Sequence, residues 1–393
     1  MEVNCLKVLL VHDGYFPTGS AFASRLTNIA RLLKYSGYSV HVIAAYTKDK
    51  SIETHRTYNI DGITYQITDS KNRGSIDTFI GPKNFYKSVK EYIKNNKLDF
   101  VITSRGLTYF VKLVEECHRN NVCCIVEQCE WLDISAFKFK KCDPRYLMMN
   151  YLFSHGYQKA DGILAISRML EDYYTKLGLN TIRIPTIVEF DNLCVRTHGR
   201  SDKKRKIIFT GNLGNHKELL KPIFEAFSRN PQLMECFQFD IYGADKKQVI
   251  SNVGSAELVD FAVNTTMHGM VDQTTMNEIQ SQADFQFFMR PNRRSSNAGF
   301  PTKLGESMSA GTPVITNNTG DICCYVKNGV NGIIVNDSIE LENALINIMN
   351  MSDEQIVQMR TNAYQTARQS FNYVSYKEEI IEFLNKVRLS KRK

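Results

Sequence analysis

A chain of 393 residues is longer than one hydrophobic core usually serves, so two domains are expected. Its hydrophobic fraction of 43%, charged fraction of 23% and net charge of +8 are ordinary for a soluble globular protein. That mild positive charge suits an anionic substrate or an anionic membrane surface, but it is too small to indicate a nucleic-acid-binding protein.

The ten cysteines are scattered or adjacent and form no C-x-x-C pair. The start "MEVNCLKVLLVHDGYFP" is typical of a first strand rather than of a cleavable leader. These features predict a reduced, cytoplasmic protein. No apolar run approaches the roughly 18–20 residues that cross a bilayer, so we expect any membrane contact to be peripheral, on the inner face.

The first half alternates predicted strands and helices. A strand over Leu6–Gly14 leads into a helix from about Ser20, which Gly37 ends, and "SVHVIAA" forms the next strand. Further strands are predicted over residues 99–105, 122–128 and 161–170. This β-loop-α-β pattern predicts a parallel sheet, in a Rossmann-like domain over residues 1–195.

A glycine-containing loop follows the first strand. Gly14 and Gly19 stand before the helix, where free backbone N–H groups can receive a phosphate. The spacing matches neither a dinucleotide fingerprint nor a P-loop. A plain turn with Ser20 as helix cap explains the same residues.

The segment Trp131–Phe153 mixes aromatic residues and methionines with a basic cluster of Lys138, Lys140, Lys141 and Arg145. This composition suits a helix lying on an anionic lipid surface, and it equally suits a core helix with a charged edge.

A polar, basic stretch near residues 195–206 predicts a linker, and a second α/β series occupies residues 206–370. Residues 371–393 contain an amphipathic helix and a basic tail. In the second series we expect three stretches at the carboxyl edge of the sheet. They are the glycine loop with Gly211, Asn212, Gly214 and Lys217, then His268–Val271, and then Asn297–Ile315. The backbone of the second stretch could contact a base, although His268 alone is more typical of a structural histidine.

The third stretch predicts a helix with Thr302 as N-cap and Gly311 just past its end. Lys303 and Glu306 then share one face. A cation in the first turn opposes the helix dipole, and a bound anion would reverse that sign. Lys303 would grip phosphate while Glu306 accepts hydrogen bonds from ribose hydroxyls. The alternative is a solvated surface pair.

The chain resembles the retaining, nucleotide-sugar-dependent glycosyltransferases of group 1. The resemblance covers nearly the whole chain and rests on "FPTGSAFASRLTNIARLL", "KADGILAISRML", "FTGNLGNHKELLKPIFEAF", "HGMV", "ADFQFFMRP" and, most specifically, "FPTKLGESMSAGTPVITNNTGDICCYVKNGVNGIIV". It implies a GT-B fold, an α/β architecture of two Rossmann-like domains facing each other across a cleft. The first domain would bind the acceptor and the second the donor, and the last helix would cross back onto the first.

The resemblance also implies residue roles. Glu306 would hold the ribose, Lys217 and Lys303 would contact the diphosphate as catalytic cations, and Gly19 would close over the phosphates. The full expected donor set is Gly19, Gly211, Asn212, His268, Met270, Asn297, Ala298, Gly299, Phe300, Lys303, Leu304 and Glu306.

Two positions depart from the family pattern. Ala298 stands where many members carry a glutamate, so sugar contacts would fall to the backbone N–H groups of residues 298–300 and to Asn297. Glu127 and Glu130 lie where many members carry a histidine, and either could contact the donor sugar or the acceptor. Both could instead be carboxylates on a loop surface or behind the site.

The expected reaction moves a sugar from a UDP- or GDP-linked donor to a hydroxyl acceptor with retention of configuration. The acceptor would be a glycan or a lipid-linked sugar in cell-surface polysaccharide synthesis. No D-x-D pair implies a metal, so Lys217, Lys303 and the helix termini would stabilise the leaving diphosphate. The alternatives are an epimerase or a phosphorylase-like enzyme on the same fold, or a non-catalytic nucleotide-sugar-binding protein.

Overall fold

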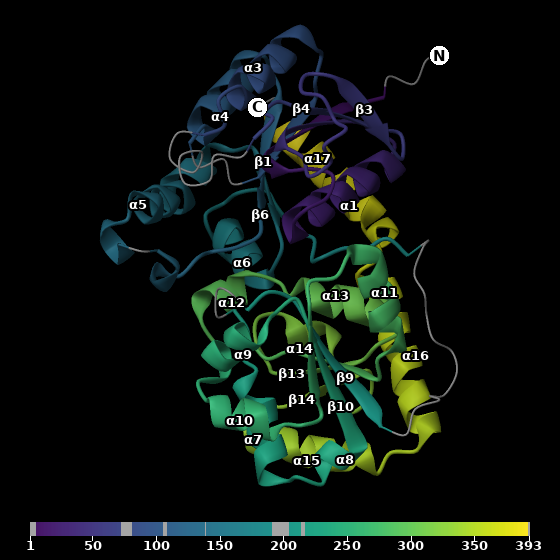
Figure 1. The fold of residues 1–393 in the computed structure, drawn as a ribbon. Helices are drawn as coiled ribbons and strands as arrows, with labels where there is room; N and C mark the ends of the chain where they lie inside the picture. The colour runs from purple at the N-terminus through teal and green to yellow at the C-terminus, as the bar shows by residue number, and fades with distance from the viewer. Residues whose placement is uncertain are drawn as a thin grey trace. The chain divides into compact units, whose positions relative to one another are not determined.

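The computed structural model describes residues 5–71, 81–104, 108–137, 139–190, 204–213 and 217–391. The chain divides into two compact units (Figure 1). Unit 1 comprises Met1–Ile187 together with Tyr373–Lys393, and unit 2 comprises Val188–Asn372. Most of the predicted linker, along with Lys138 and Gly214, lies outside the described residues.

Unit 1 is built on an eight-stranded sheet in the order β3-β4-β2-β1-β5-β6-β7-β8. Every neighbouring pair is parallel except β3 and β4, which form an antiparallel hairpin at one edge. The strands are β1 (Lys7–Tyr15), β2 (Ser39–Tyr46), β3 (Thr57–Ile60), β4 (Ile63–Ile67), β5 (Phe100–Ser104), β6 (Cys123–Gln128), β7 (Gly162–Ala165) and β8 (Thr181–Arg183).

The helices of unit 1 follow from local sequence signals. The hydroxyl of Ser20 accepts a hydrogen bond from the Ala23 N–H and caps α1. Ser167 caps α6 in the same way, which ends β7 earlier than the predicted strand over 161–170. The helices are α1 (Ala21–Tyr35), α3 (Phe85–Asn95), α4 (Phe110–Arg119), α5 (Pro144–Tyr151), α6 (Arg168–Lys176) and α17 (Lys377–Lys391), with a π-helical turn at Leu152–Gly156.

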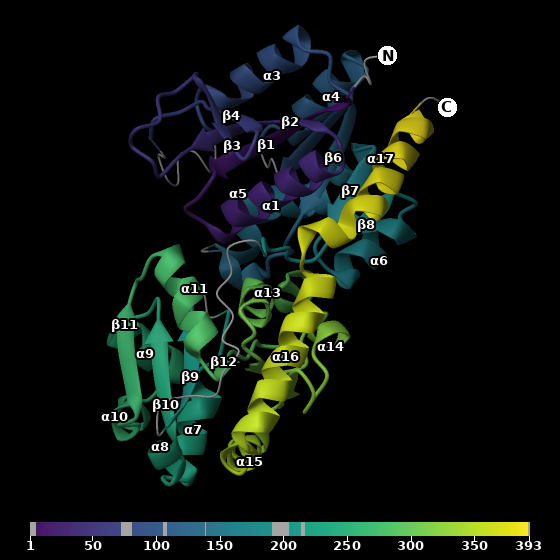
Figure 2. The same ribbon diagram turned by 90° about the vertical axis from the view of Figure 1, so that its right-hand side faces the viewer.

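The C-terminal helix α17 completes the core of unit 1. It packs beside α1 and the strands β6 and β8 (Figure 2). Its residues Ile380, Phe383, Leu384 and Val387 are buried. The packing is close at Gly162 of β7. A Cβ atom there would lie 2.8 Å from a methyl group of Val387 and 2.9 Å from the ring of Phe383.

Unit 2 contains a six-stranded sheet in the order β11-β10-β9-β12-β13-β14, with every pair parallel. The strands are β9 (Arg205–Thr210), β10 (Phe237–Tyr242), β11 (Thr265–Gly269), β12 (Phe285–Phe287), β13 (Val314–Thr316) and β14 (Gly332–Ile334). The predicted α/β class with two parallel, Rossmann-like sheets is therefore confirmed.

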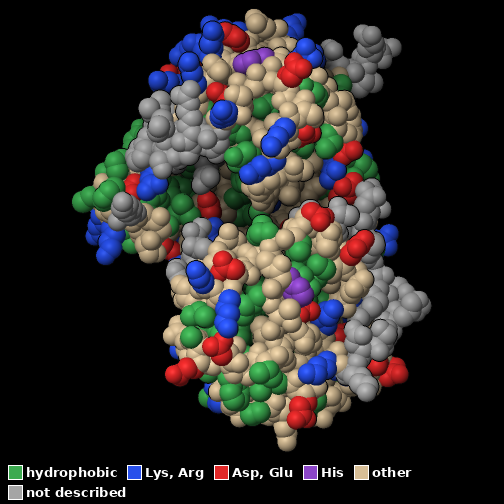
Figure 3. All heavy atoms as spheres, viewed as in Figure 1, with side chains coloured by type: hydrophobic (Ala, Val, Ile, Leu, Met, Phe, Trp, Pro, Cys, Tyr) green, Lys and Arg blue, Asp and Glu red, His purple; other side chains and the backbone are tan. Residues whose placement is uncertain are grey.

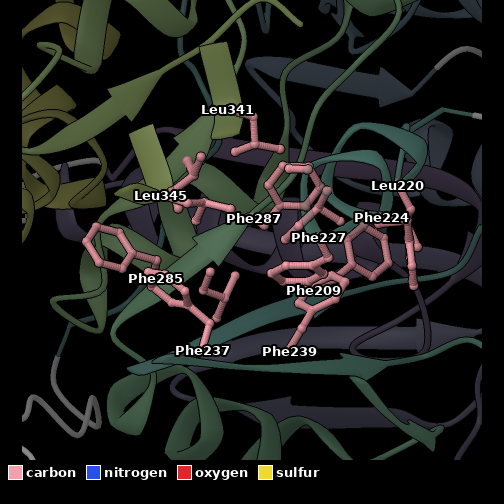
Figure 4. Packing of buried hydrophobic residues seen from close by; sticks show 14 of the residues in the cluster. Phe209, Leu220, Phe224, Phe227, Phe237, Phe239, Phe285, Phe287, Leu341 and Leu345 are labelled. Atoms are coloured by element: carbon pink, nitrogen blue, oxygen red, sulfur yellow. The ribbon is translucent and has the colours of Figure 1, made fainter. Parts of the chain in front are cut away.

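The main core of unit 2 is rich in phenylalanine. Phe209, Phe237, Phe239, Phe285 and Phe287 of the strands meet Phe224 and Phe227 of α7 and Leu341 and Leu345 of α15 (Figure 4). A smaller apolar cluster with α11 covers part of the opposite face. The helices are α7 (Lys221–Arg229), α8 (Leu233–Cys236), α9 (Lys246–Val253), α10 (Ala256–Phe261), α11 (Gln273–Gln282), α12 (Arg294–Ala298), α13 (Thr302–Ser309), α14 (Ile322–Tyr325), α15 (Ser338–Met349) and α16 (Asp353–Ser370).

Acidic and basic side chains are interspersed on the visible surface of both units (Figure 3). Within the described ranges, no helix is both long and apolar enough to cross a bilayer.

Candidate functional site

Helix α13 begins at the carboxyl side of the unit 2 sheet and has an unusual N-terminus. Its N-cap is Pro301, so the predicted cap at Thr302 is wrong by one residue. Proline offers no side-chain acceptor, and within the described residues no side chain caps this end. The Pro301 carbonyl accepts from the Leu304 N–H at 3.1 Å. The first N–H groups of such a helix stay available to an anion.

The other end of α13 follows the predicted pattern. Gly311 has φ +70°, a left-handed conformation that favours glycine. Its N–H donates to the Met308 carbonyl, and the Thr312 N–H donates to the Ser307 carbonyl at 2.9 Å. The stop holds α13 to eight residues, with its N-terminus fixed at the sheet edge.

Lys303, in the first turn of α13, is held by a carboxylate. Its Nζ lies 2.6 Å from Oε2 of Glu218, and the two side chains are 13% and 11% exposed. The same Nζ lies 5.2 Å from the centroid of the Phe209 ring. Glu218 therefore offsets the unfavourable position of a cation at a helix N-terminus.

Gly211, at the end of β9, leaves the space that Lys303 occupies. Its φ is +131°, and a Cβ atom on it would lie 2.8 Å from Nζ and 2.9 Å from Cε of Lys303. Gly243 packs equally tightly on Gly211, because a Cβ there would meet the Gly211 carbonyl carbon at 2.9 Å. Gly211 and Gly243, at the ends of β9 and β10, thus form a narrow surface under the ammonium group, which we call the glycine floor.

Arg290 is a second cation of this site, and sequence reasoning missed it. It is buried, and its Nη1 donates to the Ser296 carbonyl at 2.9 Å. Burial lowers the pKa of its guanidinium, and the charge of Glu218 opposes that effect. Glu218 therefore acts on both Lys303 and Arg290. The signal available in the sequence was an arginine directly after the phenylalanine-rich stretch "DFQFFM".

Glu306 lies one turn after Lys303 and is half-buried. Burial raises the pKa of its carboxyl above the usual value, and the Lys303 ammonium acts in the opposite direction. When ionised, this carboxylate can accept two or more hydrogen bonds from hydroxyl groups.

Lys217 lies in the loop that precedes helix α7. Helix α7 begins at Lys221, and the exposed Lys217 precedes it. Two hydrogen bonds hold the residues between Lys217 and α7. The Leu219 N–H donates to the Met289 carbonyl, just past β12, at 2.8 Å, and Nδ2 of Asn252 on α9 donates to the Glu218 carbonyl. This tether places Glu218, a residue that sequence reasoning passed over, against Lys303. Asn212 is exposed in the same loop.

The residues expected to hold the sugar have varied environments. Ala298 and Leu304 are fully buried, and Phe300 packs its ring against Tyr325 and Phe371, so these side chains serve the core. The Gly299 N–H donates to the Ser295 carbonyl at 3.1 Å, so this group already has a partner within the protein.

Asn297 connects two neighbouring loops. Its Nδ2 donates to Oδ1 of Asn292 at 3.0 Å, and its Oδ1 accepts from the Gly320 N–H at 2.9 Å. Both ends of the amide are thus engaged within the protein.

His268 lies on β11, the edge strand, and its side chain has a structural role. Its ring stacks on Tyr242 at 4.4 Å, and its Nε2 lies 3.2 Å from Oδ1 of Asp240. The Gly269 carbonyl accepts from the Gly243 N–H, which joins this strand end to the glycine floor. Met270 follows with its side chain 80% exposed.

In unit 1, the side chain of Glu127 is enclosed by the protein. It is 0% exposed, and its Oε1 accepts from Nε of Arg25 at 2.6 Å and lies 2.7 Å from Sγ of Cys129. Burial raises the pKa of the Cys129 thiol, which therefore stays neutral. Glu130 is half-buried, and Gly19 is exposed with φ +106° beside the Ser20 cap.

Comparison with known families identifies this arrangement. Residues 195–369, which contain the whole described site of unit 2, match the family described as glycosyl transferases group 1. The chain therefore carries, in unit 2, a domain that matches this family of retaining glycosyltransferases. It is therefore a nucleotide-sugar-dependent glycosyltransferase, as the sequence motifs predicted. No curated protein sequence matches the chain closely enough to count as a relative.

Solved structures show the fold. Sucrose-phosphate synthase from Thermosynechococcus elongatus is 14% identical, with 98% of this chain and 100% of that chain covered and a TM-score of 0.72. Anabaena HepE in complex with UDP and glucose is 14% identical, covering 97% and 99%, with a TM-score of 0.67. The lipopolysaccharide outer core galactosyltransferase WaaB is 15% identical, covering 98% and 100%, with a TM-score of 0.62. The GT-B fold is thereby confirmed for this glycosyltransferase.

Proposed function

We propose that this glycosyltransferase takes a sugar from a UDP- or GDP-linked donor and transfers it to a hydroxyl group of a glycan or a lipid-linked sugar. The observation that carries the donor part is the group formed by Lys303, Arg290 and the uncapped N-terminus of α13. Three sources of positive potential converge there, with Glu218 as the carboxylate between them.

The chemistry of transfer explains this arrangement. When the bond from the sugar to the diphosphate breaks, negative charge develops on the departing phosphate oxygen. A fixed ammonium group and fixed helix N–H groups stabilise that charge without reorganising. Lys303 is suited to the task because Glu218, Phe209 and the glycine floor already hold it in place. Lys217 can add a second ammonium from the exposed loop.

Glu306 supplies the proposed ribose contact. It follows Lys303 by one helical turn, so the two side chains can serve adjacent parts of one nucleotide. A hydrogen bond to a charged group contributes about 1.5–3 kcal/mol, which makes this carboxylate a substantial part of donor affinity.

The relatives suggest which compounds to test first. HepE was solved with UDP and glucose, so UDP-glucose heads the donor panel. WaaB is a galactosyltransferase of the lipopolysaccharide outer core, which supports a glycan carried on a lipid as acceptor. We assign acceptor binding to unit 1.

The test is a thermal-shift panel of UDP-, GDP-, CMP- and dTDP-sugars, followed by product analysis with and without acceptor glycans. We expect stabilisation by one class of nucleotide diphosphate sugar, and acceptor-dependent transfer with the anomeric configuration retained. Conversion of the donor without an acceptor would indicate an epimerase. Binding that never leads to turnover across acceptors would indicate a nucleotide-sugar-binding protein. Either result would overturn the proposal.

A further inference from the structure

Helix α5 and the turns before it carry an apolar surface on the outside of unit 1. The segment leaves the end of β6, passes through short 3-10 turns at Ile134–Ala136 and Lys140–Cys142, and continues into α5. Its single acidic residue between positions 134 and 160 is Asp143. None of the residues proposed for the donor site lies in this segment.

The inner side of the segment is anchored in unit 1. The ring of Trp131 stacks on Phe153 at 4.7 Å and meets Tyr173 at 4.8 Å. Met149 and Leu152 are also buried. These contacts supply the apolar face that a helix needs in order to pack, so the other side of α5 is not required for folding.

The opposite side of α5 is apolar as well. Pro144, Leu147, Met148 and Tyr151 are spaced at i, i+3, i+4 and i+7 and share one face. Leu147 is 56% exposed and Tyr151 50%, and Phe139 in the preceding turn is 62% exposed. We call these residues the outer α5 face. Single exposed apolar residues are common, but a contiguous group of this kind marks a contact surface.

The charges beside this face are positive. Lys140 and Lys141 are exposed directly after Phe139. Asp143 is buried and bound by two nitrogens of Arg145, at 2.9 and 2.8 Å, so its charge is matched within the protein. In Figure 3, apolar and basic side chains lie together over the α5 region.

We propose that the outer α5 face binds reversibly to an anionic membrane surface. The apolar side chains enter the boundary between headgroups and acyl chains, and the lysines remain at the level of the phosphates. The two lysines also repel an identical basic face, which disfavours a second copy of this chain as the occupant. This inference concerns where the enzyme works and stands independently of the acceptor's identity.

The size of the face agrees with a weak anchor. Helix α5 has eight residues, so it spans about 12 Å along its axis, too short to enter a bilayer as a span. Each lysine near an anionic surface strengthens partition about fivefold, and this effect is screened as salt rises. Binding should therefore need both the apolar and the basic residues.

The experiment is co-sedimentation of the full chain with vesicles of phosphatidylcholine, alone or mixed with phosphatidylglycerol. We expect binding to the mixed vesicles that weakens at high salt. The pair Lys140→Glu and Lys141→Glu should reduce the partition coefficient by at least about thirtyfold, and Leu147→Ser with Tyr151→Ser by about tenfold. The matched controls are Lys246→Glu with Lys247→Glu, another exposed adjacent pair, and Ile339→Ser, which is 63% exposed.

Equal sedimentation with and without phosphatidylglycerol would overturn the proposal, as would equal losses in the control variants. Self-association that only the α5 variants abolish, without vesicle binding, would assign the face to a dimer and also overturn it. Donor turnover with a soluble acceptor should be unchanged in every α5 variant. A failure of vesicle binding alone would thus leave the proposed transfer reaction intact.

Discussion

Each unit holds a short ion pair beside the carboxyl ends of its strands, and the two pairs differ in solvent exposure. We call the pair that is shielded from solvent the closed pair and the more exposed one the open pair. Arg25 and Glu127 in unit 1 are 2.6 Å apart and 3% and 0% exposed. Lys303 and Glu218 in unit 2 are also 2.6 Å apart, but they are 13% and 11% exposed. Similar distances therefore accompany different access to solvent.

The partners of the two cations explain the difference. Arg25 donates to Glu127 through Nε and to the Pro185 and Ile184 carbonyls through Nη1 and Nη2, so all three nitrogens serve the protein. Lys303 is paired with the carboxylate of Glu218 and lies beside an aromatic ring, at a helix end that no side chain caps among the described residues. A closed pair of this kind supports the fold, whereas an open pair can share its cation with an incoming phosphate.

The largest expected effect tests the closed pair. Arg25→Ala leaves a buried carboxylate without its cation, and should lower the free energy of unfolding by about 3–5 kcal/mol. Urea denaturation measures the change. The control is Arg31→Ala on the same helix, whose pair with Asp61 is partly exposed and should contribute less than about 1 kcal/mol. Equal losses of unfolding free energy in the two variants would contradict a structural role for the closed pair.

The next effect tests the open pair. Lys303→Ala should lower turnover about 100- to 1,000-fold, corresponding to about 2.7–4 kcal/mol of lost electrostatic stabilisation. The free energy of unfolding should also fall, by less than for Arg25→Ala, because Glu218 is nearly buried and loses its cation. Steady-state kinetics with the best donor measures the effect, with Lys221→Ala as control because that lysine pairs with Glu225 on the surface. Wild-type turnover would reduce Lys303 to a structural residue.

Glu306→Gln should weaken donor binding about 10- to 100-fold, since hydrogen bonds to a charged acceptor contribute about 1.5–3 kcal/mol. Calorimetry with the nucleotide and with its 2′-deoxy analogue measures this loss. The two ligands should differ for the wild type and differ much less for the variant. An equal preference for the ribose hydroxyl in both proteins would remove Glu306 from that role.

Glu306 should also make the free energy of unfolding depend on pH. Because the folded-state pKa of Glu306 is raised, its contribution to stability is full below the unfolded pKa of about 4.3 and is lost as pH rises through the folded pKa. Glu306→Gln should therefore be more stable than the wild type at neutral pH and lose that advantage in acid. Denaturation at both pH values measures it, and a pH-independent difference would contradict the burial argument.

The smallest effect concerns Glu218. Because its carboxylate competes with phosphate for Lys303, Glu218→Gln should tighten nucleoside diphosphate binding by roughly fivefold, about 1 kcal/mol for a partly exposed pair. Titration calorimetry measures the change. Weaker binding would mean that Glu218 chiefly holds Lys303 in position.

The sequence predicted the architecture because it is encoded locally. Apolar runs that end in turn residues marked the strands, and Gly311 marked the end of α13. Boundaries shifted where two local signals competed, as with Pro301 against Thr302, or where a capping serine ended β7 early.

The site was harder to predict because its contacts are long-range. Glu127 and Arg25 are 102 residues apart in the chain, so nothing local shows that this carboxylate is enclosed. Glu218 stands beside Lys217 in a loop, and the bond from the Leu219 N–H to the Met289 carbonyl, just past β12, helps to direct Glu218 toward Lys303. Nothing local in the sequence shows that Arg290, which follows β12, is buried.

Calorimetric titration of wild-type protein and Lys303→Ala with UDP, GDP and the matching nucleosides tests the central claim most directly. The account predicts that the wild type binds one nucleoside diphosphate well, and that Lys303→Ala weakens this binding while leaving the affinity for the nucleoside unchanged. Equal diphosphate affinity in the two proteins would contradict a phosphate site at the N-terminus of α13.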